Sequence, residues 1–269
     1  MTKLAFIGAG RIAQAIIGGL INQGFVAANM TAADPDTRIL DSLPGGVRRS
    51  ADNLQAASDA DVVILCVKPN MTKSVVSDLA ITLTGRLLIS VAAGIRESDL
   101  TTWSGGTTVI RCMPNTPALI RQGMVGLYSS GASTEQRSLA EELLGAVGST
   151  AWFESDDDLD KVTALSGSGP AYFFYLMEAM IDAGVALGIS EDASRTLVLN
   201  TALGAAAMAV ESAESPSQLR ANVTSPGGTT EAALKVLASH GLSANMDAAV
   251  KAAYHRAIEL GDNASPGST

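Results

Sequence analysis

The sequence predicts an α/β fold in which an N-terminal domain built on a parallel sheet is followed by an all-helical dimerisation domain. Three observations support this prediction. Short β-type runs alternate with helical stretches over residues 1 to about 150, which is the pattern of parallel βαβ units. From about Asp156 onward no strand pattern recurs, and Ala, Leu and Met repeat at helical spacing. Some of these helices are apolar on nearly every side, so they require cover from all directions.

The predicted strands are short and several are almost continuously apolar, as expected for strands that are covered on both faces. They span residues 3–7, 30–33, a short run near Val47, 61–67, 87–92, 107–111, 124–129 and 150–154. Between the last two runs, Ser133 has the side chain and the position of a helix N-cap. We therefore expect a sheet domain over residues 1–155.

The second half is predicted to contain helices over residues 172–187, 191–211 and 230–237. The acidic run at 156–158 fits the first turn of a helix, where carboxylates face the positive end of the dipole. The stretch 202–210 is apolar all round, and a domain of about 110 residues is too small to bury it alone. We therefore predict a helical domain over residues 156–262 that pairs with a second copy of the chain. A disordered tail with linker composition is expected at 263–269.

Composition and charge argue against several kinds of partner. The formal net charge is −9 and the 18 Lys and Arg residues are scattered, whereas nucleic-acid binding requires clustered cations. The first ten residues hold too few apolar side chains for a signal peptide or a membrane span, so we expect a cytoplasmic protein with no membrane partner. Cys66 and Cys112 lack the spacing of a paired motif. We interpret both as reduced and structural, and we expect no metal site.

A glycine-rich string follows the first predicted strand. Residues 8–13 read GAGRIA, the GxGxxA pattern that opens a helix in Rossmann-type dinucleotide-binding domains. In that pattern Gly8 permits the tight turn, Gly10 lets the backbone approach a pyrophosphate, and Ala13 lets the helix pack close to the sheet. The alternative is a purely structural strand-to-helix turn. The cofactor contacts predicted here are Ile7, Gly8, Ala9, Gly10, Arg11 and Ile12.

Asp34 ends the second predicted strand, where an acidic side chain would bond the adenosine ribose hydroxyls and repel a 2′-phosphate. This position favours NADH. Arg38, one turn further on, could instead meet a 2′-phosphate. Because Asp34 also begins the turn Asp34-Pro35, it has an alternative interpretation as an Asx turn or helix cap, and the coenzyme preference stays open.

Two further loops are expected at the carboxyl ends of parallel strands, where open α/β sheets bind their ligands. They would frame a nicotinamide. Lys68 is the one cation in these loops, and its alternative is an ordinary solvated lysine. The residues assigned to the cofactor here are Cys66, Val67, Lys68, Pro69, Ala92 and Ala93.

Residues 225–230, SPGGTT, stand in front of an apolar helix deep in the second half. A helix N-terminus with free N–H groups is a ready anion site, and glycine removes any Cβ from the path of the ligand. The alternative is a capped helix start with nothing bound, because Thr and Gly are good N-cap residues.

Four strings in this order resemble pyrroline-5-carboxylate reductase: VKP at 67–69, RCMPNTP at 111–117, SGSGPAY at 166–172 and SPGGTT at 225–230. The resemblance runs from Gly8 to about Leu237. It implies reduction of Δ1-pyrroline-5-carboxylate to L-proline, the last step of proline biosynthesis, with NADPH or NADH as hydride donor. It also implies two chains that interlock through their helical domains, with decamers or other assemblies of dimers possible.

The resemblance also implies roles for individual residues. Thr230 matches the catalytic threonine of the family, whose hydroxyl meets the ring nitrogen. Asn53 matches a residue that touches the adenosine ribose, and Asn222 matches one that reaches the cofactor from the partner chain. Either asparagine could instead be a simple helix cap. Asn115, in the second string, is also assigned to the cofactor. The substrate carboxylate is assigned to Ser225, Gly227, Gly228, Thr229 and Thr230, where Thr229 caps the helix or adds an N–H.

Two rival functions can be tested against these strings. β-Hydroxyacid dehydrogenases need a lysine about four residues after a glycine cluster early in the helical domain, and the corresponding region here, SGSGPAYFFYL, has none. A non-catalytic dinucleotide sensor would need the glycine-rich string but would have no use for an anion-binding helix start.

In one respect the chain departs from the family pattern, because Asp34 stands where many relatives have a small hydroxyl residue. This departure weakens any inference of strict NADPH use.

Overall fold

The computed structural model describes residues 1–264, which divide into two compact units. The sheet unit comprises Met1–Ser168 together with the chain from Ala252 onward. The helical unit comprises Gly169–Lys251. The compact units therefore divide the chain differently from the predicted domains 1–155 and 156–262, because the helix after residue 155 and the end of the last helix both pack with the sheet.

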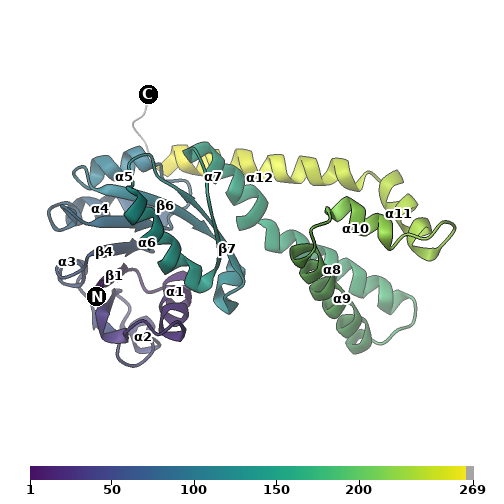
Figure 1. Ribbon diagram of the computed structural model, residues 1–269, viewed down its shortest axis with the longest axis horizontal. Coiled ribbons are helices and arrows are strands. Elements are labelled where there is room, and N and C mark those ends of the chain that lie inside the picture. Colours follow the sequence, from purple (N-terminus) through teal and green to yellow (C-terminus); the bar gives the residue numbers. More distant parts are fainter. Residues whose placement is uncertain (265–269) are drawn as a thin grey trace. The chain divides into compact units, whose positions relative to one another are not determined.

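Figure 1 shows the sheet unit with its covering helices. Its eight strands lie in the order β3-β2-β1-β4-β5-β6-β7-β8. All neighbouring strands are parallel except the pair β6 and β7. The strands are β1 (Leu4–Ile7), β2 (Met30–Ala33), β3 (Arg48–Ser50), β4 (Val62–Leu65), β5 (Leu87–Ser90), β6 (Thr108–Pro114), β7 (Gly123–Tyr128) and β8 (Gly148–Trp152).

The pair β6 and β7 is the one antiparallel step in a sheet that is otherwise parallel, as predicted. Only a short segment containing the 3₁₀ turn η2 (Thr116–Ile120) connects β6 to β7. A parallel crossover needs a dozen or more residues, so this connection returns the chain in the opposite direction. Arg121 ends η2 in the left-handed region, with φ 61°.

Helices cover both faces of the sheet, which explains the apolar strand runs. Side chains from α1 (Arg11–Asn22), α2 (Thr37–Asp41) and α6 (Thr134–Leu144) share one core with Leu4 and Phe6. The opposite core combines Ala5 and Ile7 with side chains from three helices. These are α3 (Asn53–Ala57), α4 (Pro69–Leu83) and α5 (Glu97–Trp103). Alternate residues of β1 thus enter opposite cores, as the pleat of a strand requires.

Several local expectations are confirmed in this unit. Ser133 caps α6, and together with Gln136 it forms a capping box. The acidic run occupies the first turn of α7 (Asp156–Val162), and the side chain of Ser155 caps that helix. A π-helical segment, η4 (Thr163–Gly167), follows α7 at the end of the first segment of the sheet unit. The remaining 3₁₀ turns are η1 (Ala27–Asn29) and η3 (Gly145–Val147).

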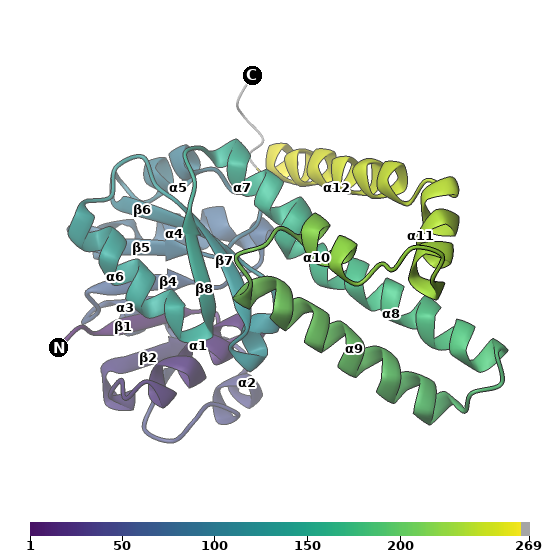
Figure 2. The same ribbon diagram turned by 45° about the vertical axis from the view of Figure 1, so that its right-hand side comes forward.

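The helical unit contains α8 (Gly169–Ala186), α9 (Glu191–Glu211), α10 (Pro216–Asn222), α11 (Thr229–Ser239) and the first part of α12 (Leu242–Ala264). Helices α8 and α9 lie side by side (Figure 2). They are in close contact at Gly184, where an added Cβ atom would lie 2.7 Å from Oγ of Ser194. Within the described residues, α9 alone is long and apolar enough to meet the length and composition of a membrane span, although core helices of soluble proteins also do so.

Many large apolar side chains of the helical unit are exposed in the single chain. They include Phe173, Phe174, Tyr175, Leu187, Leu197, Leu203, Met208, Val210, Val223 and Val236. This exposure agrees with the prediction that the stretch 202–210 needs cover from outside its own domain.

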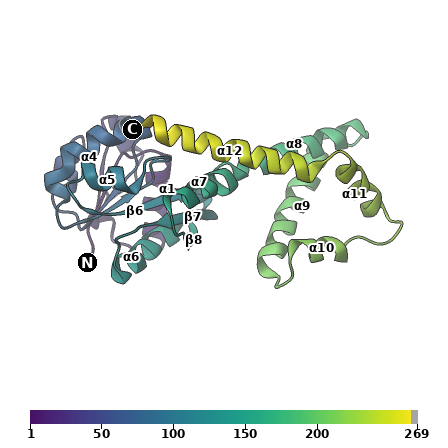
Figure 3. The ribbon, with the colours of Figure 1, turned by 90° about the horizontal axis from the view of Figure 1, so that it is seen from above.

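Helix α12 falls within the predicted all-helical domain, although no range of its own was predicted, and its end corrects the expected tail. The helix continues through Asn263 and Ala264, the first residues of the segment predicted as disordered, while 265–269 lie outside the described residues. Its C-terminal end lies beside α5 (Figure 3). Gly261 touches Gly94, and an added Cβ on Gly94 would lie 2.9 Å from the Cα of Gly261. This close packing overrides the linker-like composition of the segment.

Candidate functional site

The loop between β1 and α1 requires glycine for two separate reasons. Gly8 has φ +90°, and an added Cβ atom there would lie 2.8 Å from the carbonyl oxygen of Cys66. The Gly8 N–H donates to the carbonyl oxygen of Ala33 at 2.8 Å, which ties the loop to the end of β2. At Gly10 the missing Cβ faces open space. The loop therefore leaves one side of its backbone accessible.

The N-terminus of α1 has unused donors. Gly10 is the N-cap and makes no side-chain capping bond. Within residues 1–264, the backbone N–H groups of Arg11, Ile12 and Ala13 donate to no other group. Ala13 itself is fully buried, so α1 can pack closely on the sheet. Free N–H groups at a helix N-terminus bind phosphate, and this loop fits the pyrophosphate of a dinucleotide.

Asp34 is fixed at the end of β2 by two backbone donors. Its Oδ2 accepts from the N–H of Ala9 at 2.9 Å, and its Oδ1 accepts from the N–H of Asp36 at 2.9 Å. The Asx turn weighed from the sequence is thus present, and the same carboxylate also supports the glycine-rich loop. Arg38 is occupied by Asp36, with hydrogen bonds of 3.0 and 2.7 Å.

The loops after β4 and β5 begin at the same edge of the sheet, as predicted. Leu65 pairs with Ser90 at the ends of these strands, and the N–H of Val91 donates to the carbonyl oxygen of Leu65 at 3.0 Å. The loops contain the predicted residues Cys66, Val67, Lys68, Pro69, Ala92 and Ala93. Lys68 is exposed at the N-cap of α4, and Pro69 is the first helical residue.

The two thiols are structural in character. Burial raises the pKa of Cys66 to about 12 and also raises the pKa of Cys112. Both cysteines are free. A thiol must lose its proton to act as a nucleophile, so neither side chain is suited to that role.

Asn115 joins two of the four sequence strings. Its Nδ2 donates to the carbonyl oxygen and to the Oγ of Ser166, at 3.3 and 3.2 Å, while its Oδ1 accepts from the N–H of Met124 at 2.9 Å. The same two strings also meet at Gly167, where an added Cβ would lie 2.7 Å from Cε of Met113. The predicted cofactor residue Asn115 thus uses its amide to hold the chain around Ser166.

Sequence reasoning missed a buried ionic group beside these strings. Arg111, in β6, is 4% exposed and pairs with Asp156 of α7. Asp156 also accepts from the N–H of Glu97, at 3.2 and 3.3 Å. The Glu97 carboxylate accepts from the N–H of Ser130 at 2.9 Å. The arginine within an apolar strand was the sequence signal for this buried ionic group, because a buried charge needs a partner.

The N-terminus of α11 is also uncapped. Gly228 is the N-cap without a side-chain bond, and Thr229 and Thr230 are the first two helical residues. In the described part of the chain no group accepts from the N–H of Thr229, Thr230 or Glu231. Both threonines are exposed. The idea that Thr229 caps the helix is therefore wrong, and Thr229 instead adds an N–H to the opening.

The two glycines before α11 differ in what they do. Gly227 has φ +71° and faces open space, and its N–H donates to Oε2 of Glu231 at 2.5 Å. Gly228 donates to the carbonyl oxygen of Ser225 at 3.0 Å, and an added Cβ would lie 3.1 Å from that oxygen. Gly227 thus leaves room for a ligand, whereas Gly228 and Ser225 close the turn. Hydrogen bonds from Lys235 and from the Gly227 N–H lower the pKa of Glu231.

Neither asparagine taken from the resemblance is a helix cap. Asp52 caps α3 through the N–H groups of Leu54 and Gln55, and Asn53 is the first helical residue. Asn222 is the last residue of α10, and its side chain bonds Glu214 at 2.9 Å and Gln218 at 2.8 Å. The capping alternatives considered for both residues are therefore wrong.

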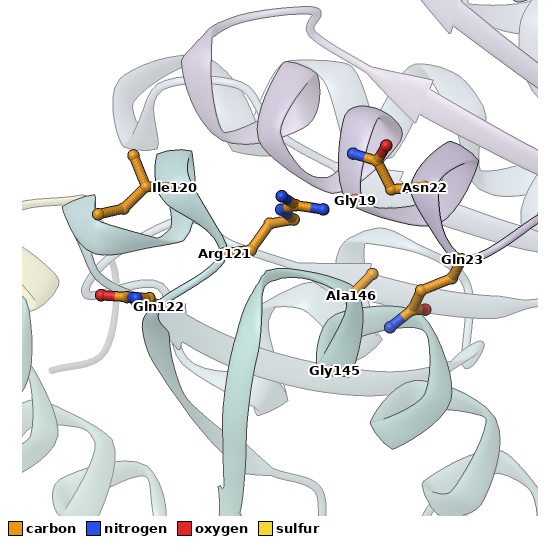
Figure 4. A pocket seen from close by; sticks show the side chains of 8 residues that line it. All are labelled: Gly19, Asn22, Gln23, Ile120, Arg121, Gln122, Gly145 and Ala146. Atoms are coloured by element: carbon orange, nitrogen blue, oxygen red, sulfur yellow. The ribbon is translucent and has the colours of Figure 1, made fainter. Parts of the chain in front are cut away.

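Two pockets lie away from the predicted site residues. One, of about 420 Å³, lies between the end of α1 and the turn at Arg121 (Figure 4). The other, of about 640 Å³, is lined by α8 and α9. Among the described residues, no group of three or more His, Cys, Asp or Glu side chains could hold a metal ion.

Comparisons with known proteins match both parts of the chain. A family profile described as pyrroline-5-carboxylate reductase dimerisation matches residues 156–260, and one described as NADP oxidoreductase coenzyme F420-dependent matches residues 3–94. The pyrroline-5-carboxylate reductase of Pseudomonas aeruginosa is 47% identical over 265 residues, covering 97% of each chain.

Solved structures of two relatives extend this likeness. The structure of a pyrroline-5-carboxylate reductase from Coxiella burnetii has a TM-score of 0.92 and 41% identity, covering 96% of this chain and 98% of that one. A pyrroline carboxylate reductase from Plasmodium falciparum, solved with NADP bound, has a TM-score of 0.86 and 28% identity, covering 97% and 98%.

Proposed function

The chain belongs to the pyrroline-5-carboxylate reductase family, and we infer that it reduces Δ1-pyrroline-5-carboxylate to L-proline with NADPH or NADH as hydride donor. One structural observation carries the assignment to particular residues. Two helices, α1 and α11, begin without a side-chain cap and with unused N–H groups. A dinucleotide brings a pyrophosphate and the substrate brings a carboxylate, so each helix start has an anion to bind.

We propose that the sheet unit holds the coenzyme. The free N–H groups at the start of α1 donate to the pyrophosphate oxygens, and Asn53 lies toward the adenosine ribose. The loops after β4 and β5 flank the nicotinamide, with Lys68 at the entrance to α4. Asn115 acts indirectly by holding the segment around Ser166. When bound, the reduced nicotinamide supplies the hydride.

The opening of α11 is proposed to hold the substrate. The N–H groups of Thr229 and Thr230 donate to its carboxylate, and Gly227 leaves space for that group. Glu231 holds the N–H of Gly227 and so fixes the shape of the turn, which Ser225 and Gly228 close. Because the carboxylate is fixed, one face of the ring is presented for reaction.

Thr230 is proposed as the catalytic residue. A protonated imine is already an electrophile, so the enzyme needs correct placement and exclusion of water more than a strong base. The hydroxyl of Thr230 hydrogen-bonds the ring nitrogen and steadies it as its positive charge is lost. None of the residues assigned to substrate or coenzyme is a histidine, which agrees with this chemistry.

We further propose that the enzyme is a cytoplasmic homodimer with interlocked helical units. In this arrangement the α11 opening and Asn222 of one subunit complete the coenzyme site of the other, and assemblies of dimers such as decamers can form. The exposed apolar side chains of α8 and α9 support the proposal, because a stable soluble chain does not leave so many uncovered.

Turnover of Thr230→Ala tests the role of Thr230. With pyrroline-5-carboxylate and either coenzyme, we expect loss of reduced-nicotinamide absorbance in the wild type and a more than tenfold lower kcat/KM in the variant. The Kd for coenzyme should not change. Thr102→Ala is the matched control, because that exposed hydroxyl bonds only within α5. Wild-type turnover in Thr230→Ala would remove Thr230 from the mechanism, whereas coenzyme binding without turnover in the wild type would favour a sensor.

A further inference from the structure

We propose that Asp34, together with the ion pair between Asp36 and Arg38, makes this reductase select NADH over NADPH. The inference rests on the proposed function in one respect, which is that a dinucleotide binds at the glycine-rich loop. It goes beyond that function because family membership leaves the coenzyme open. The relative from Plasmodium falciparum was solved with NADP bound, at only 28% identity to this chain.

Asp34 lies where the adenosine ribose of a bound dinucleotide is expected. It directly follows β2, whose last residue, Ala33, pairs with Ile7 beside the glycine-rich loop. In dinucleotide-binding folds an acidic residue after this strand bonds the ribose 2′-hydroxyl. The hydrogen bond from Ala9 joins the carboxylate directly to the loop that would carry the pyrophosphate.

The carboxylate is held in place and still has acceptor capacity. Each oxygen of Asp34 accepts one backbone N–H, from Ala9 and from Asp36. A carboxylate oxygen can accept two hydrogen bonds, so each oxygen retains one position for a ribose hydroxyl. Because two backbone groups fix the side chain, it cannot rotate freely to make room for a 2′-phosphate.

Arg38, the cation that could meet a 2′-phosphate, is already neutralised. Arg38 donates from Nε to Oδ1 of Asp36 at 3.0 Å and from Nη2 to Oδ2 at 2.7 Å. Asp36 also caps α2 through the N–H of Arg38, which fixes the carboxylate that holds the guanidinium. This pairing lowers the pKa of Asp36 and raises that of Arg38. A 2′-phosphate would therefore meet the uncompensated charge of Asp34 and an arginine with a carboxylate already bound.

The arginines of the neighbouring strand do not replace Arg38. Arg48 pairs with Thr31, toward the start of β2, whereas Asp34 lies beyond its end. Arg49 donates to the carbonyl oxygen of Leu43 at 3.0 Å and lies 3.9 Å from a carboxylate oxygen of Asp41. Arg49 is therefore engaged elsewhere, and Arg48 lies at the end of β3 away from Asp34.

Kinetics and binding with both coenzymes test the proposal. We expect the wild type to favour NADH in kcat/KM, and in Kd measured from the fluorescence of each reduced coenzyme, by about tenfold or more. Asp34→Ser should lower this NADH preference by a similar factor. Asp36→Asn retains a cap acceptor but releases Arg38, so it should tighten NADPH binding several-fold and leave NADH binding unchanged. Asp78→Asn removes one exposed negative charge on α4 and should leave both ratios unchanged.

Failure of this inference can be distinguished from failure of the proposed function. A wild type that binds NADPH as tightly as NADH, or tighter, would overturn the selection proposal even if it makes proline. An unchanged preference in both folded variants would also overturn it. Tight, selective NADH binding without any turnover would instead support the role of Asp34 and contradict the assigned reaction. If Asp34→Ser does not fold, the wild-type ratio and Asp36→Asn still decide the question.

Discussion

Gly18 and Gly19 are neighbours in the middle of α1, yet a side chain at each would meet a different environment. An added Cβ on Gly18 faces open space, while one on Gly19 would overlap the carbonyl oxygen of Ala146. We expect Gly18→Ala to stabilise the fold by about 0.5–1 kcal/mol, because alanine restricts the unfolded chain and favours helix. Gly19→Ala should destabilise it by about 1–3 kcal/mol through overpacking.

Thermal unfolding of both variants would test this pair. For a chain of this size, 1 kcal/mol corresponds to roughly 2–4 °C in Tm, so the two variants should differ by several degrees in opposite directions. Equal shifts for the two substitutions would contradict the proposed close contact between α1 and Ala146.

Asp160 offers a pH-dependent prediction at the residue scale. The side chain is buried, and this burial raises its pKa, although the charges of Arg111 and Arg96 oppose the shift. The contribution of protonated Asp160 to the free energy of unfolding is therefore fully present below the ordinary aspartate pKa of about 3.9. It is lost as the pH rises through the raised pKa of the folded state. Asp160→Asn cannot ionise, so its Tm should exceed that of the wild type at pH 7, and the difference should shrink toward pH 4.

Asp157 provides a control of opposite sign for this pH series. Hydrogen bonds from Lys161 and Tyr254 lower its pKa. Its contribution is therefore present above the ordinary pKa and is lost as the pH falls. Asp157→Asn should lower Tm at pH 7 and converge with the wild type in acid. If both variants move in the same direction at pH 7, the interpretation of Asp160 is wrong.

At the scale of elements, the end of α12 supports the loop that follows β5. Gly261 and Gly94 meet backbone to backbone, and an added Cβ on Gly261 would lie 2.6 Å from the carbonyl oxygen of Gly94. The ion pair between Arg96 and Asp262, at 3.6 Å, links the same two segments. This packing holds the loop that contains Ala92 and Ala93, which we assign to the nicotinamide.

Gly261→Ala is expected to displace this loop. The variant should show a several-fold higher KM for the coenzyme with a smaller change in kcat, because placement of the nicotinamide is affected more than the substrate site. Gly18→Ala is the control for adding a methyl group to a helical glycine, and it should leave KM unchanged. An unchanged KM in Gly261→Ala would show that the loop keeps its position without α12.

The sequence predicts some elements well because their signals are local. The limits of β2 and α9 match the predicted 30–33 and 191–211, and Ser133 marks the start of α6. The direction of β7 depends instead on how short the connection through η2 is. The last turns of α12 depend on contact with Gly94, which is distant in sequence, so linker composition alone was misleading.

The same distinction holds within the candidate site. The glycine-rich loop and the α11 opening are contiguous strings, and both could be located from the sequence. The buried group of Arg111, Glu97 and Asp156 comes from three separate elements. Its members become neighbours only after folding, so sequence spacing could not show it.

At the scale of the whole molecule, the exposed apolar helices predict that association and stability are linked. Leu203 on α9 is 64% exposed among other apolar side chains, whereas Ile81 on α4 is 92% exposed. Leu203→Glu should shift the protein toward monomer in analytical ultracentrifugation and lower its Tm, because burying an unpaired charge is costly. Ile81→Glu should leave the assembly intact. A monomeric wild type at micromolar concentration would contradict this prediction.

The division of the chain has a consequence for how such proteins can be recombined. The sheet unit is formed from Met1–Ser168 and from the chain after Lys251, so the helical unit is an insertion and not an appended module. A chimera with a single crossover at residue 168 would receive the last turns of α12 from a different parent. Exchanging the helical unit cleanly between relatives therefore requires two junctions, one before Gly169 and one inside α12.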